Sequence, residues 1–312
     1  MYKAGREKPK LIVLLGPTAC GKTGWSLRLA KKYNGEIISA DSRQIFSKMD
    51  IGTAKEPGEW RWSGFRRVYF IADIPHYLID FLDPGKKFTA AHFRDKALKY
   101  VKLVLKNKHQ PIIVGGTGLY ISSLVDNLQI PRVPPNKKLR ESLEEKNIDE
   151  LFSLLKNIDP ESAQKINKNN KRRIIRALEV SILSGEPFSK QRLRGEQLFQ
   201  VLKIGIEVDR DELYKRIDKR IDAMMDKGLL AEVKKLASKK YNWDLSSLSG
   251  IGYRQFKDFL EGKQNLEQAV ELLKKDTKRY AKRQLTWFRR DKEIKWVKNY
   301  EDAEKLVGEF LQ

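Results

Sequence analysis

Residues 11–23 read LIVLLGPTACGKT, and this stretch decides the fold. Its first five residues are apolar and rich in branched side chains, which predicts a buried parallel strand. Residues 16–23 match the pattern G-x-x-x-x-G-K-[ST], and the apolar spacing of residues 23–33 predicts a helix directly after it. A strand, a glycine-rich turn and a helix in this order indicate a P-loop, in which backbone N–H groups and the positive end of a helix surround phosphate oxygens.

Each part of this loop has an expected task. Lys22 is expected to reach the outer phosphates, and Thr23 to hold a magnesium ion. A P-loop indicates a di- or triphosphate without saying which, so the site is a candidate for either a diphosphate or a nucleotide such as ATP. The candidate phosphate ligands are Gly16, Pro17, Thr18, Ala19, Cys20, Gly21, Lys22 and Thr23.

Apolar runs and helical patterns alternate outward from the loop, which predicts an α/β fold with a mostly parallel, P-loop-type sheet. The pattern changes after Asp126, where three prolines precede a region that reads as entirely helical. We therefore expect a core formed by residues 1–126 and 198–312, with helices at its C-terminal end, and a helical insertion at 127–197. The expected strands are 11–15, 36–40, 77–79, 111–114, 200–208 and 295–297, and the expected helical regions are 23–33, 90–106, 137–184 and 211–285.

Two acids follow expected strands, and the first of them would emerge at the same sheet edge as the P-loop. Asp41 follows the second strand, where it is suited to act as a general base or, equally, to cap the next helix. Asp80 follows residues 77–79 and keeps a kinase or ATPase interpretation open, because such enzymes use an acid there to help hold magnesium. Gly115-Gly116-Thr117-Gly118 ends a further strand; its glycines suit either a close ligand or a tight turn.

The composition indicates a globular protein with a polyanionic partner. Hydrophobic residues make up 40% and charged residues 33% of the 312 positions, and Lys plus Arg outnumber Asp plus Glu by 63 to 41, a net charge of +22. Such an excess favours nucleic acid or an acidic membrane surface, although a lysine-rich proteome would produce it too. The single cysteine fits a reducing cytosol, and no apolar run is long enough for a membrane span.

Basic residues concentrate in two stretches. Residues 165–194 hold nine basic and two acidic side chains, and residues 274–298 hold eleven and three. In the second stretch the basic residues recur at helical spacing, which would form a nearly all-positive face suited to a phosphate backbone. Trp287 and Phe288 lie within it, and we expect both to pack in the core rather than to stack on bases.

The motifs together resemble one family, the tRNA dimethylallyltransferases (isopentenyl-tRNA transferases, or IPP transferases). The resemblance spans nearly the whole chain, and its second and last motifs are highly specific. Departures are few: Cys20 stands in place of Ser, Phe46 in place of Tyr, Tyr77 in place of a second His, and residues 57–70 form a longer segment than usual. The absence of further cysteines resembles the bacterial type without a zinc finger. The matching motifs are GPTACGKT (16–23), SADSRQIFSKMDIGTAK (39–55), PHYLID (75–80), GGTGLY (115–120), RRIIRALEV (172–180), GIGYRQF (250–256) and KRYAKRQLTWFRR (278–290).

The resemblance implies an activity and its partners. The donor would be dimethylallyl diphosphate. The acceptor would be N6 of the adenine at position 37, 3′ of the anticodon, in tRNAs that read codons beginning with U, and diphosphate would be released. The family pattern also implies Mg²⁺ as cofactor, the tRNA anticodon stem-loop as partner, a cytoplasmic location without membrane association, and a monomer.

The resemblance also assigns residues to roles. Asp41 would accept the N6 proton, Thr117 would orient the reacting centre, and Lys22 would stabilise the departing diphosphate. Arg216 and Arg220, one helical turn apart, are candidates for an added diphosphate clamp, although an exposed helix face explains them equally well. The candidate tRNA-binding residues are Asp41, Ser42, Arg43, Gln44, Thr117, Arg140, Arg172, Arg173, Arg176, Gly252, Tyr253, Arg254, Lys278, Arg279, Lys282 and Arg283.

Three alternatives remain open from the sequence. A small-molecule kinase would use the P-loop and Asp80 but leaves the positive helices unexplained. A prenyltransferase acting on free adenine nucleotides would use the P-loop and Asp41 but has no need of an RNA-facing surface. A non-enzymatic RNA-binding protein with a degenerate P-loop conflicts with the intact Lys22 and Thr23.

Overall fold

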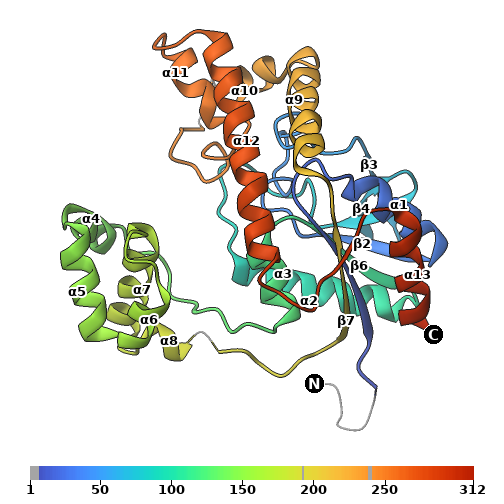
Figure 1. Ribbon diagram of the computed structural model, residues 1–312, viewed down its shortest axis with the longest axis horizontal. Coiled ribbons are helices and arrows are strands. Elements are labelled where there is room, and N and C mark those ends of the chain that lie inside the picture. Colours follow the sequence, from blue (N-terminus) through green and yellow to red (C-terminus); the bar gives the residue numbers. More distant parts are fainter. Residues whose placement is uncertain (1–6, 192, 238–240) are drawn as a thin grey trace. The chain divides into compact units, whose positions relative to one another are not determined.

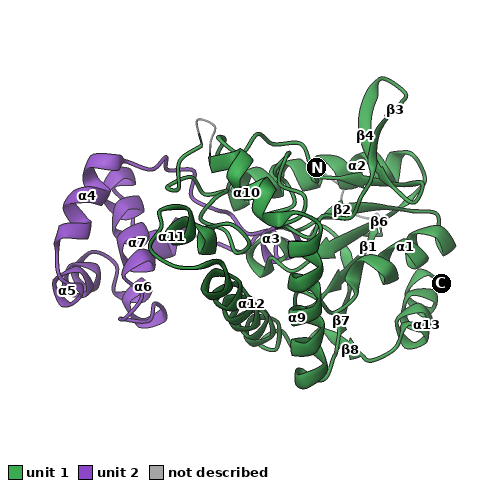
Figure 2. Cartoon of the chain, turned by 90° about the horizontal axis from the view of Figure 1, so that it is seen from above, with its two compact units in different colours: residues 1–121, 198–312 green, residues 122–197 purple. Residues whose placement is uncertain are grey.

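The structure is a computed structural model that describes residues 7–191, 193–237 and 241–312. The chain forms two compact units with separate cores (Figure 2). Unit 1 consists of residues 1–121 and 198–312, and unit 2 of residues 122–197. No described helix is both long enough and apolar enough to cross a membrane.

Unit 1 is built on an eight-stranded sheet with the strand order β3-β4-β5-β2-β6-β1-β7-β8. The six strands from β5 to β8 in this order run parallel, and β4 is antiparallel to both of its neighbours. The α/β class with a mostly parallel sheet is therefore confirmed. The strands are β1 (Lys10–Leu15), β2 (Gly35–Ser39), β3 (Glu59–Ser63), β4 (Arg66–Ile71), β5 (Ile74–Tyr77), β6 (Gln110–Gly115), β7 (Gln200–Ile206) and β8 (Lys295–Val297).

Strand β1 lies between β6 and β7, with Ile12 paired to Ile112 on one side and to Leu202 on the other. Its apolar residues 11–15 are all buried. A strand of a parallel sheet that is covered on both faces reads as a continuous apolar run, which explains why LIVLL does not alternate with polar residues. The deciding stretch of the sequence thus forms the middle of the sheet.

Helices cover both faces of this sheet (Figure 1). Ile12 and Ile37 point to the face that packs against α1, because they share a core cluster with Leu29. Tyr77 is paired with Ile38, the neighbour of Ile37, and therefore points to the opposite face, where it stacks on Tyr100 of α2 with ring centroids 4.5 Å apart. The helices of unit 1 are α1 (Lys22–Lys32), α2 (Ala90–Lys106), α3 (Gly118–Val125, which continues into unit 2), α9 (Arg210–Asp226), α10 (Leu229–Ala237), the 3₁₀ helix η1 (Arg254–Phe256), α11 (Lys257–Leu260), α12 (Leu266–Phe288) and α13 (Tyr300–Leu311).

The C-terminal helices pack beyond the carboxyl ends of the strands. Ile217 and Ile221 of α9 share the core of unit 1 with Ile45 and Met49, which follow β2. Leu273 and Ala281 of α12 belong to the same cluster. The long helices α9 and α12 therefore stand over the sheet edge where the P-loop ends.

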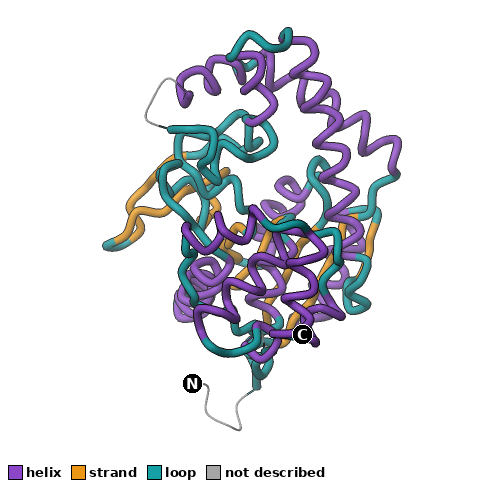
Figure 3. The backbone as a smooth tube through the Cα atoms, turned by 90° about the vertical axis from the view of Figure 1, so that its left-hand side faces the viewer, coloured by secondary structure: helices purple, strands orange, loops and turns teal. Residues whose placement is uncertain are grey.

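The segment Pro57–Phe70 contains a β-hairpin that the sequence analysis did not anticipate. Strands β3 and β4 pair from Glu59↔Phe70 to Ser63↔Arg66, with Gly64 and Phe65 as the two-residue turn. Gly64 has φ 59°, a conformation that glycine adopts without steric cost. Figures 2 and 3 show this hairpin projecting from the edge of the sheet.

Unit 2 is helical and has its own core, in which Leu151, Leu155 and Leu178 are fully buried. Asparagine or aspartate side chains accept the first free backbone N–H groups of four of its helices, as N-caps do. The helices are α4 (Lys137–Glu145), α5 (Ile148–Ile158), α6 (Pro160–Lys165), α7 (Lys171–Ser184) and α8 (Phe188–Gln191).

Candidate active site

The glycine-rich loop connects β1 to α1 at the carboxyl edge of the sheet. Gly21, at the start of the helix, has φ 95°, which a side chain would strain. The Lys22 ammonium donates across the loop to the carbonyls of Gly16, at 3.1 Å, and Pro17, at 2.6 Å. The loop thus closes around its own lysine, and the first amides of α1 face the same space.

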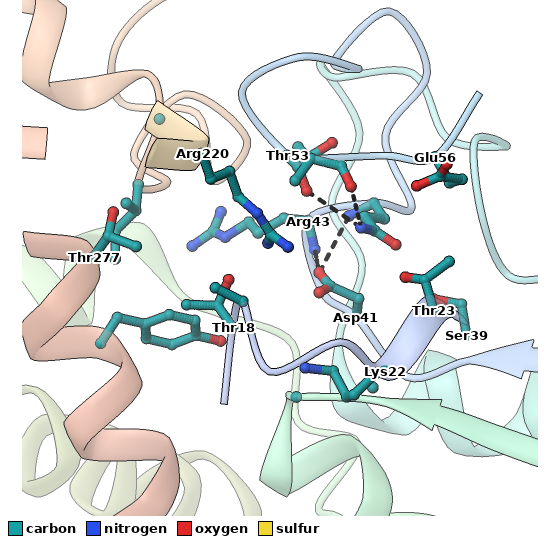
Figure 4. Close-up of a pocket in the computed structure, with 18 of the residues that line it drawn as sticks. Thr18, Lys22, Thr23, Ser39, Asp41, Arg43, Thr53, Glu56, Arg220 and Thr277 are labelled. Atoms are coloured by element: carbon teal, nitrogen blue, oxygen red, sulfur yellow. Dashed lines mark hydrogen bonds between the residues drawn. The ribbon is translucent and has the colours of Figure 1, made fainter. Parts of the chain in front are cut away.

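Asp41 follows β2, and the segment after it is a turn rather than the helix that the capping role assumed. Its Oδ1 accepts the backbone N–H groups of Arg43, at 2.8 Å, and Gln44, at 3.3 Å, and so stabilises the turn over residues 41–44. Among the described residues, none donates a hydrogen bond to Oδ2. Asp41 also lines a cavity together with Lys22, so one oxygen has a structural task while the other is available to a ligand (Figure 4).

Thr117 lies beside this turn. Its Oγ1 accepts the backbone N–H of Ser42 at 3.0 Å and donates to the Ser42 hydroxyl at 3.3 Å. The surrounding glycines are required by packing: a Cβ on Gly115 would lie 2.3 Å from the Ala40 carbonyl oxygen, and one on Gly118 would lie 2.3 Å from the Trp287 ring. The tight-turn explanation of GGTG therefore holds.

Helix α12 closes the cavity from the opposite side. The Gln284 side chain accepts the Thr18 backbone N–H and donates to the Gly116 carbonyl, both at 2.8 Å. It therefore joins the phosphate loop to the GGTG turn. Tyr280, one turn earlier, also lines the cavity, and burial raises the pKa of its hydroxyl to about 12, which keeps it protonated.

The two arginines proposed as a diphosphate clamp separate in the structure. Arg220 of α9 lines the cavity, and burial lowers the pKa of its guanidinium. Figure 4 shows its side chain reaching into the space shared with Thr18 and Asp41. Arg216 is exposed and pairs with Glu212 at 2.7 Å on its own helix, so for Arg216 the surface explanation is the correct one.

Asp80 does not face the phosphate loop. Its carboxylate accepts the ammonium of the buried Lys55 at 2.6 Å and the indole N–H of Trp60 at 3.0 Å. Lys55 is also paired with Asp50 at 2.6 Å. An acid held in this way is not free to hold a magnesium ion, which removes the residue on which the kinase interpretation depended.

The cavity as a whole measures about 560 Å³ and joins polar and apolar walls. The phosphate loop, Asp41 and Arg220 form its polar part, while Ile37 and Ile79 contribute to its apolar part. His76 also lines it, and burial lowers the pKa of this imidazole to about 4, so it is neutral at pH 7. A space of this size accommodates a small phosphorylated, partly apolar ligand.

The donor groups suit magnesium that arrives with phosphates. Among the described residues there is no group of three or more His, Cys, Asp or Glu side chains that could hold a metal by itself. Thr23, Asp41 and Glu56 nevertheless line the same cavity. Because Mg²⁺ in phosphate sites keeps waters and uses few protein ligands besides the phosphates, this set fits such an ion.

Comparison with known proteins gives a consistent assignment. A family model described as IPP transferase matches residues 44–291. The chain is 43% identical over 306 residues to a tRNA dimethylallyltransferase of Acetivibrio thermocellus (95% of each chain), and 44% identical over 313 residues to one of Alkaliphilus oremlandii (98% of this chain, 97% of the relative).

The chain belongs to the IPP transferase family. Its fold is similar to the crystal structure of the tRNA isopentenylpyrophosphate transferase of Bacillus halodurans, with a TM-score of 0.70, 36% identity, and 97% and 96% of the two chains covered. It is also similar to a eukaryotic dimethylallyltransferase described as acting on tRNA, with a TM-score of 0.77, 26% identity, and 96% of this chain and 77% of that chain covered. The resemblance inferred from the motifs is thus confirmed at the level of the family.

The family's GIGYRQF motif has a structural task that the sequence analysis missed. Tyr253 is 1% exposed, and its hydroxyl donates to Glu232 at 2.7 Å, so its side chain is not available to RNA. Gly252 packs on Gly52: a Cβ there would lie 2.4 Å from the Gly52 carbonyl oxygen. Of the three predicted contacts in this motif, only Arg254 has an exposed side chain, and it pairs with Asp276 at 2.8 Å.

The basic residues of α12 do not form one free positive face. Lys278 pairs with Asp218 of α9 at 2.7 Å, and Arg279 with Asp276 at 3.7 Å. Arg283 lines the cavity, whereas Lys282 lies with Lys278 and Arg279 along a separate groove beside α9. The predicted all-positive row is therefore partly neutralised, and its members point in two directions.

The predicted RNA-binding arginines of unit 2 also divide into two groups. Arg140 and Arg176 both pair with the fully buried Glu179, at 2.7 and 2.5 Å, so the structure gives them a stabilising task. Arg172 and Arg173, at the start of α7, are exposed. Among the predicted RNA contacts in the described part of unit 2, therefore, only Arg172 and Arg173 are exposed and not engaged in an ion pair.

Several residues at the cavity were not predicted. Thr277, Tyr280 and Gln284 follow each other at spacings of three and four on α12, which places them on one helix face. This spacing is visible in the sequence, but the neighbouring basic residues form the more prominent pattern. Glu56 carries no local signal that sets it apart, and His76 lies within the quoted motif PHYLID but was not assigned a role.

Proposed function

We propose that the chain transfers a dimethylallyl group from dimethylallyl diphosphate to N6 of adenine 37 in tRNAs that read codons beginning with U. The observation that carries this proposal is that one cavity of unit 1 holds both the phosphate loop and the free oxygen of Asp41. The names of the relatives, tRNA dimethylallyltransferase, support the same reaction.

The phosphate loop would hold the leaving group. A diphosphate in the loop would replace the Gly16 and Pro17 carbonyls as the partner of Lys22 and would accept the N–H groups at the start of α1. Arg220, from the other side of the cavity, would add a second positive charge. These groups stabilise the charge that grows on the diphosphate as it leaves. Magnesium, held by Thr23 and the phosphates, would supply further neutralisation of that charge.

Asp41 would assist the acceptor. As the N6 nitrogen attacks C1 of the dimethylallyl group, the bond from C1 to the diphosphate oxygen breaks and the nitrogen becomes positively charged. Oδ2 of Asp41 then takes the excess proton, while Oδ1 stays bound to the turn. Thr117, beside Ser42, would orient the adenine, which must leave the anticodon stack to enter the cavity.

The rest of the tRNA would be held by exposed cations. Arg172 and Arg173 in unit 2 and Lys282, Arg283 and Arg254 in unit 1 have exposed side chains and remain candidates. We propose residues 127–197 as an insertion that contacts the tRNA, in a monomeric, cytoplasmic enzyme. Arg254 and Arg283 are the candidates nearest the chemistry, because both line the cavity itself.

The test is a transfer assay with radiolabelled dimethylallyl diphosphate, Mg²⁺ and unmodified tRNA. We expect label in the RNA, which on digestion to nucleosides migrates as N6-(dimethylallyl)adenosine, with release of one diphosphate per transfer. Excess free AMP should not compete. Label transferred to AMP instead would favour a nucleotide prenyltransferase, and ATP turnover without RNA would favour a kinase.

A further inference from the structure

A second basic surface lies away from the candidate active site, where the hairpin meets helix α2. Arg66 of β4 and four lysines of α2 line one groove, together with Tyr100. All five basic side chains are exposed. We call this the α2–hairpin surface; its lysines are Lys96, Lys99, Lys102 and Lys106.

The charges of this surface are not neutralised. No acidic side chain of the described residues forms an ion pair with Arg66 or the four lysines. Helix α2 carries five basic residues and a single acid, Asp95, which pairs with Arg94 at 3.5 Å. On α12, by contrast, Lys274 and Lys278 are matched by acids of α9. The α2–hairpin surface therefore has positive charge available for an external anion.

Two exposed aromatic side chains lie near the tip of the hairpin, and one of them, Phe65, is next to Arg66 of the groove. Trp62 is 72% exposed and Phe65 is fully exposed, although side chains of this size are usually buried. Phe65 precedes Arg66 in the chain, whereas Trp62 is paired with Arg67 and therefore points to the opposite face of the hairpin from Arg66. Aromatic rings beside cations are the combination that binds nucleic acid strands, since bases stack on the rings while phosphates meet the charges.

The surface begins at the same edge of the sheet as the active site. Helix α2 starts after β5 has ended at the carboxyl edge, and it leads back to the start of β6 at the opposite edge. Lys96 is thus the member nearest the active-site edge, and Lys106 lies about 15 Å further along the helix at 1.5 Å per residue. A nucleic acid that enters the cavity has additional phosphates to place along this line.

We propose that the α2–hairpin surface binds the sugar–phosphate backbone of the tRNA outside the anticodon stem-loop, with Phe65 stacking on a base or sugar there. This inference rests on the proposed function. An acidic membrane fits less well, because α2 itself offers no apolar face to insert: its apolar residues, such as Phe93 and Val101, are buried against the sheet.

The test compares two triple variants with the same change in net charge. Lys99→Gln/Lys102→Gln/Lys106→Gln alters the surface, and the control alters three exposed lysines elsewhere on unit 1: Lys31→Gln/Lys298→Gln/Lys305→Gln. A plot of the logarithm of the binding constant against the logarithm of the salt concentration has a negative slope. Removing one cation that contacts a phosphate reduces the magnitude of this slope by about 0.7–0.9. We expect the first variant to bind full-length tRNA about tenfold or more weakly at low salt with a slope smaller by about 2, and the control to stay within about twofold.

Two further arms locate the contact. The isolated anticodon stem-loop should bind both triple variants and the wild type equally. Phe65→Ala should weaken full-length tRNA binding about fivefold, which corresponds to about 1 kcal/mol for one stacked base. Prenyl transfer by the wild type is measured in parallel. The transfer assay then tests the proposed function, and the binding assays test separately whether this surface contacts tRNA.

Three results would overturn the proposal. Equal decreases in affinity for the surface variant and the control would indicate unspecific attraction by net charge. Equal decreases for the stem-loop and for full-length tRNA would place the contact at the anticodon arm. Unchanged tRNA binding combined with weaker binding to vesicles containing anionic lipid would assign the surface to a membrane.

Discussion

Glu179 supports the sharpest stability prediction, because the sequence assigned its two arginine partners to RNA. The carboxylate is fully buried on α7 and accepts four hydrogen bonds. These come from the Asn136 backbone N–H at 2.8 Å, from Arg140 Nε at 2.7 Å and Nη2 at 2.8 Å, and from Arg176 Nη1 at 2.5 Å. Glu179→Gln keeps the shape but removes the charge and turns an amide nitrogen toward a guanidinium.

The size of the expected destabilisation depends on how exposed Arg140 and Arg176 are. A hydrogen bond to a charged group contributes about 1.5–3 kcal/mol, and breaking a buried ion pair costs about 3–5 kcal/mol. The side chains of Arg140 and Arg176 are 40% and 33% exposed, so water can solvate them once they are released, which favours the lower figures. We expect Glu179→Gln to lower the free energy of unfolding of unit 2 by about 2–3 kcal/mol.

Amide hydrogen exchange along α7 measures this destabilisation directly. A change of about 2–3 kcal/mol corresponds to exchange that is about 30- to 150-fold faster for amides that open with the whole unit. Glu186→Gln is the matched control, because it removes the same charge from an exposed position in the same unit. If α7 exchanges at the same rate in both variants, the buried cluster does not hold the unit together.

The Glu179 carboxylate also predicts that the stability of unit 2 depends on pH. Burial opposes ionisation of Glu179, but hydrogen bonds from Arg140 and Arg176 outweigh it and hold its pKa below the ordinary value. A lowered folded-state pKa means that the stabilisation is present above the unfolded pKa, about 4.3, and is lost as the pH falls from there through the folded-state pKa. The wild type should lose α7 protection on acidification, whereas Glu179→Gln should lack this component.

Three further predictions concern unit 1. Arg220→Ala should raise the KM for dimethylallyl diphosphate about tenfold or more, whereas Arg216→Ala should leave it within about twofold, as steady-state kinetics would reveal; equal effects would contradict their separation. Lys55→Met should destabilise the fold by about 3–5 kcal/mol in urea unfolding, because it leaves the partly buried Asp80 without its cation; a decrease below about 1 kcal/mol would contradict this. Tyr253→Phe should cost about 1 kcal/mol of stability without changing tRNA affinity, and a weaker complex at unchanged stability would restore its role as an RNA contact.

The parts of the fold that the sequence predicted carry local signals. Residues 11–15 form a strand, residues 16–21 a turn and residues 22–32 a helix because apolar runs, glycines and helical spacing act over a few positions. The hairpin at Glu59–Ile71 was missed although its first strand, EWRWS, alternates, its second, RRVYFI, is rich in aromatic and branched residues, and Gly64 lies at the turn. The segment was interpreted only as an unusual length within a known family, although its own composition, with glycine between two short runs of strand-forming residues, predicts a hairpin.

The site was harder to predict because it depends on partners far apart in the chain. The position of Asp41 at the sheet edge follows from the strand before it, and the cavity was predicted there. Local charge counts did not reveal that Lys278 meets Asp218, 60 positions earlier, or that Tyr253 packs on Gly52 and bonds Glu232. A residue's charge and its motif predict what it can do, while its tertiary neighbours decide whether it is free to do it.

The most direct test of the central claim is single-turnover transfer by Asp41→Asn on tRNA bound beforehand. Asparagine keeps an Oδ1 that can accept from Arg43 and Gln44, so the turn should persist and only the proton acceptor is removed. Because a general base contributes about 10²–10⁴-fold, we predict a rate at least about 100-fold lower with tRNA and donor affinities within about threefold of wild type. Transfer at the wild-type rate would contradict the claim that Asp41 accepts the proton of the RNA amine.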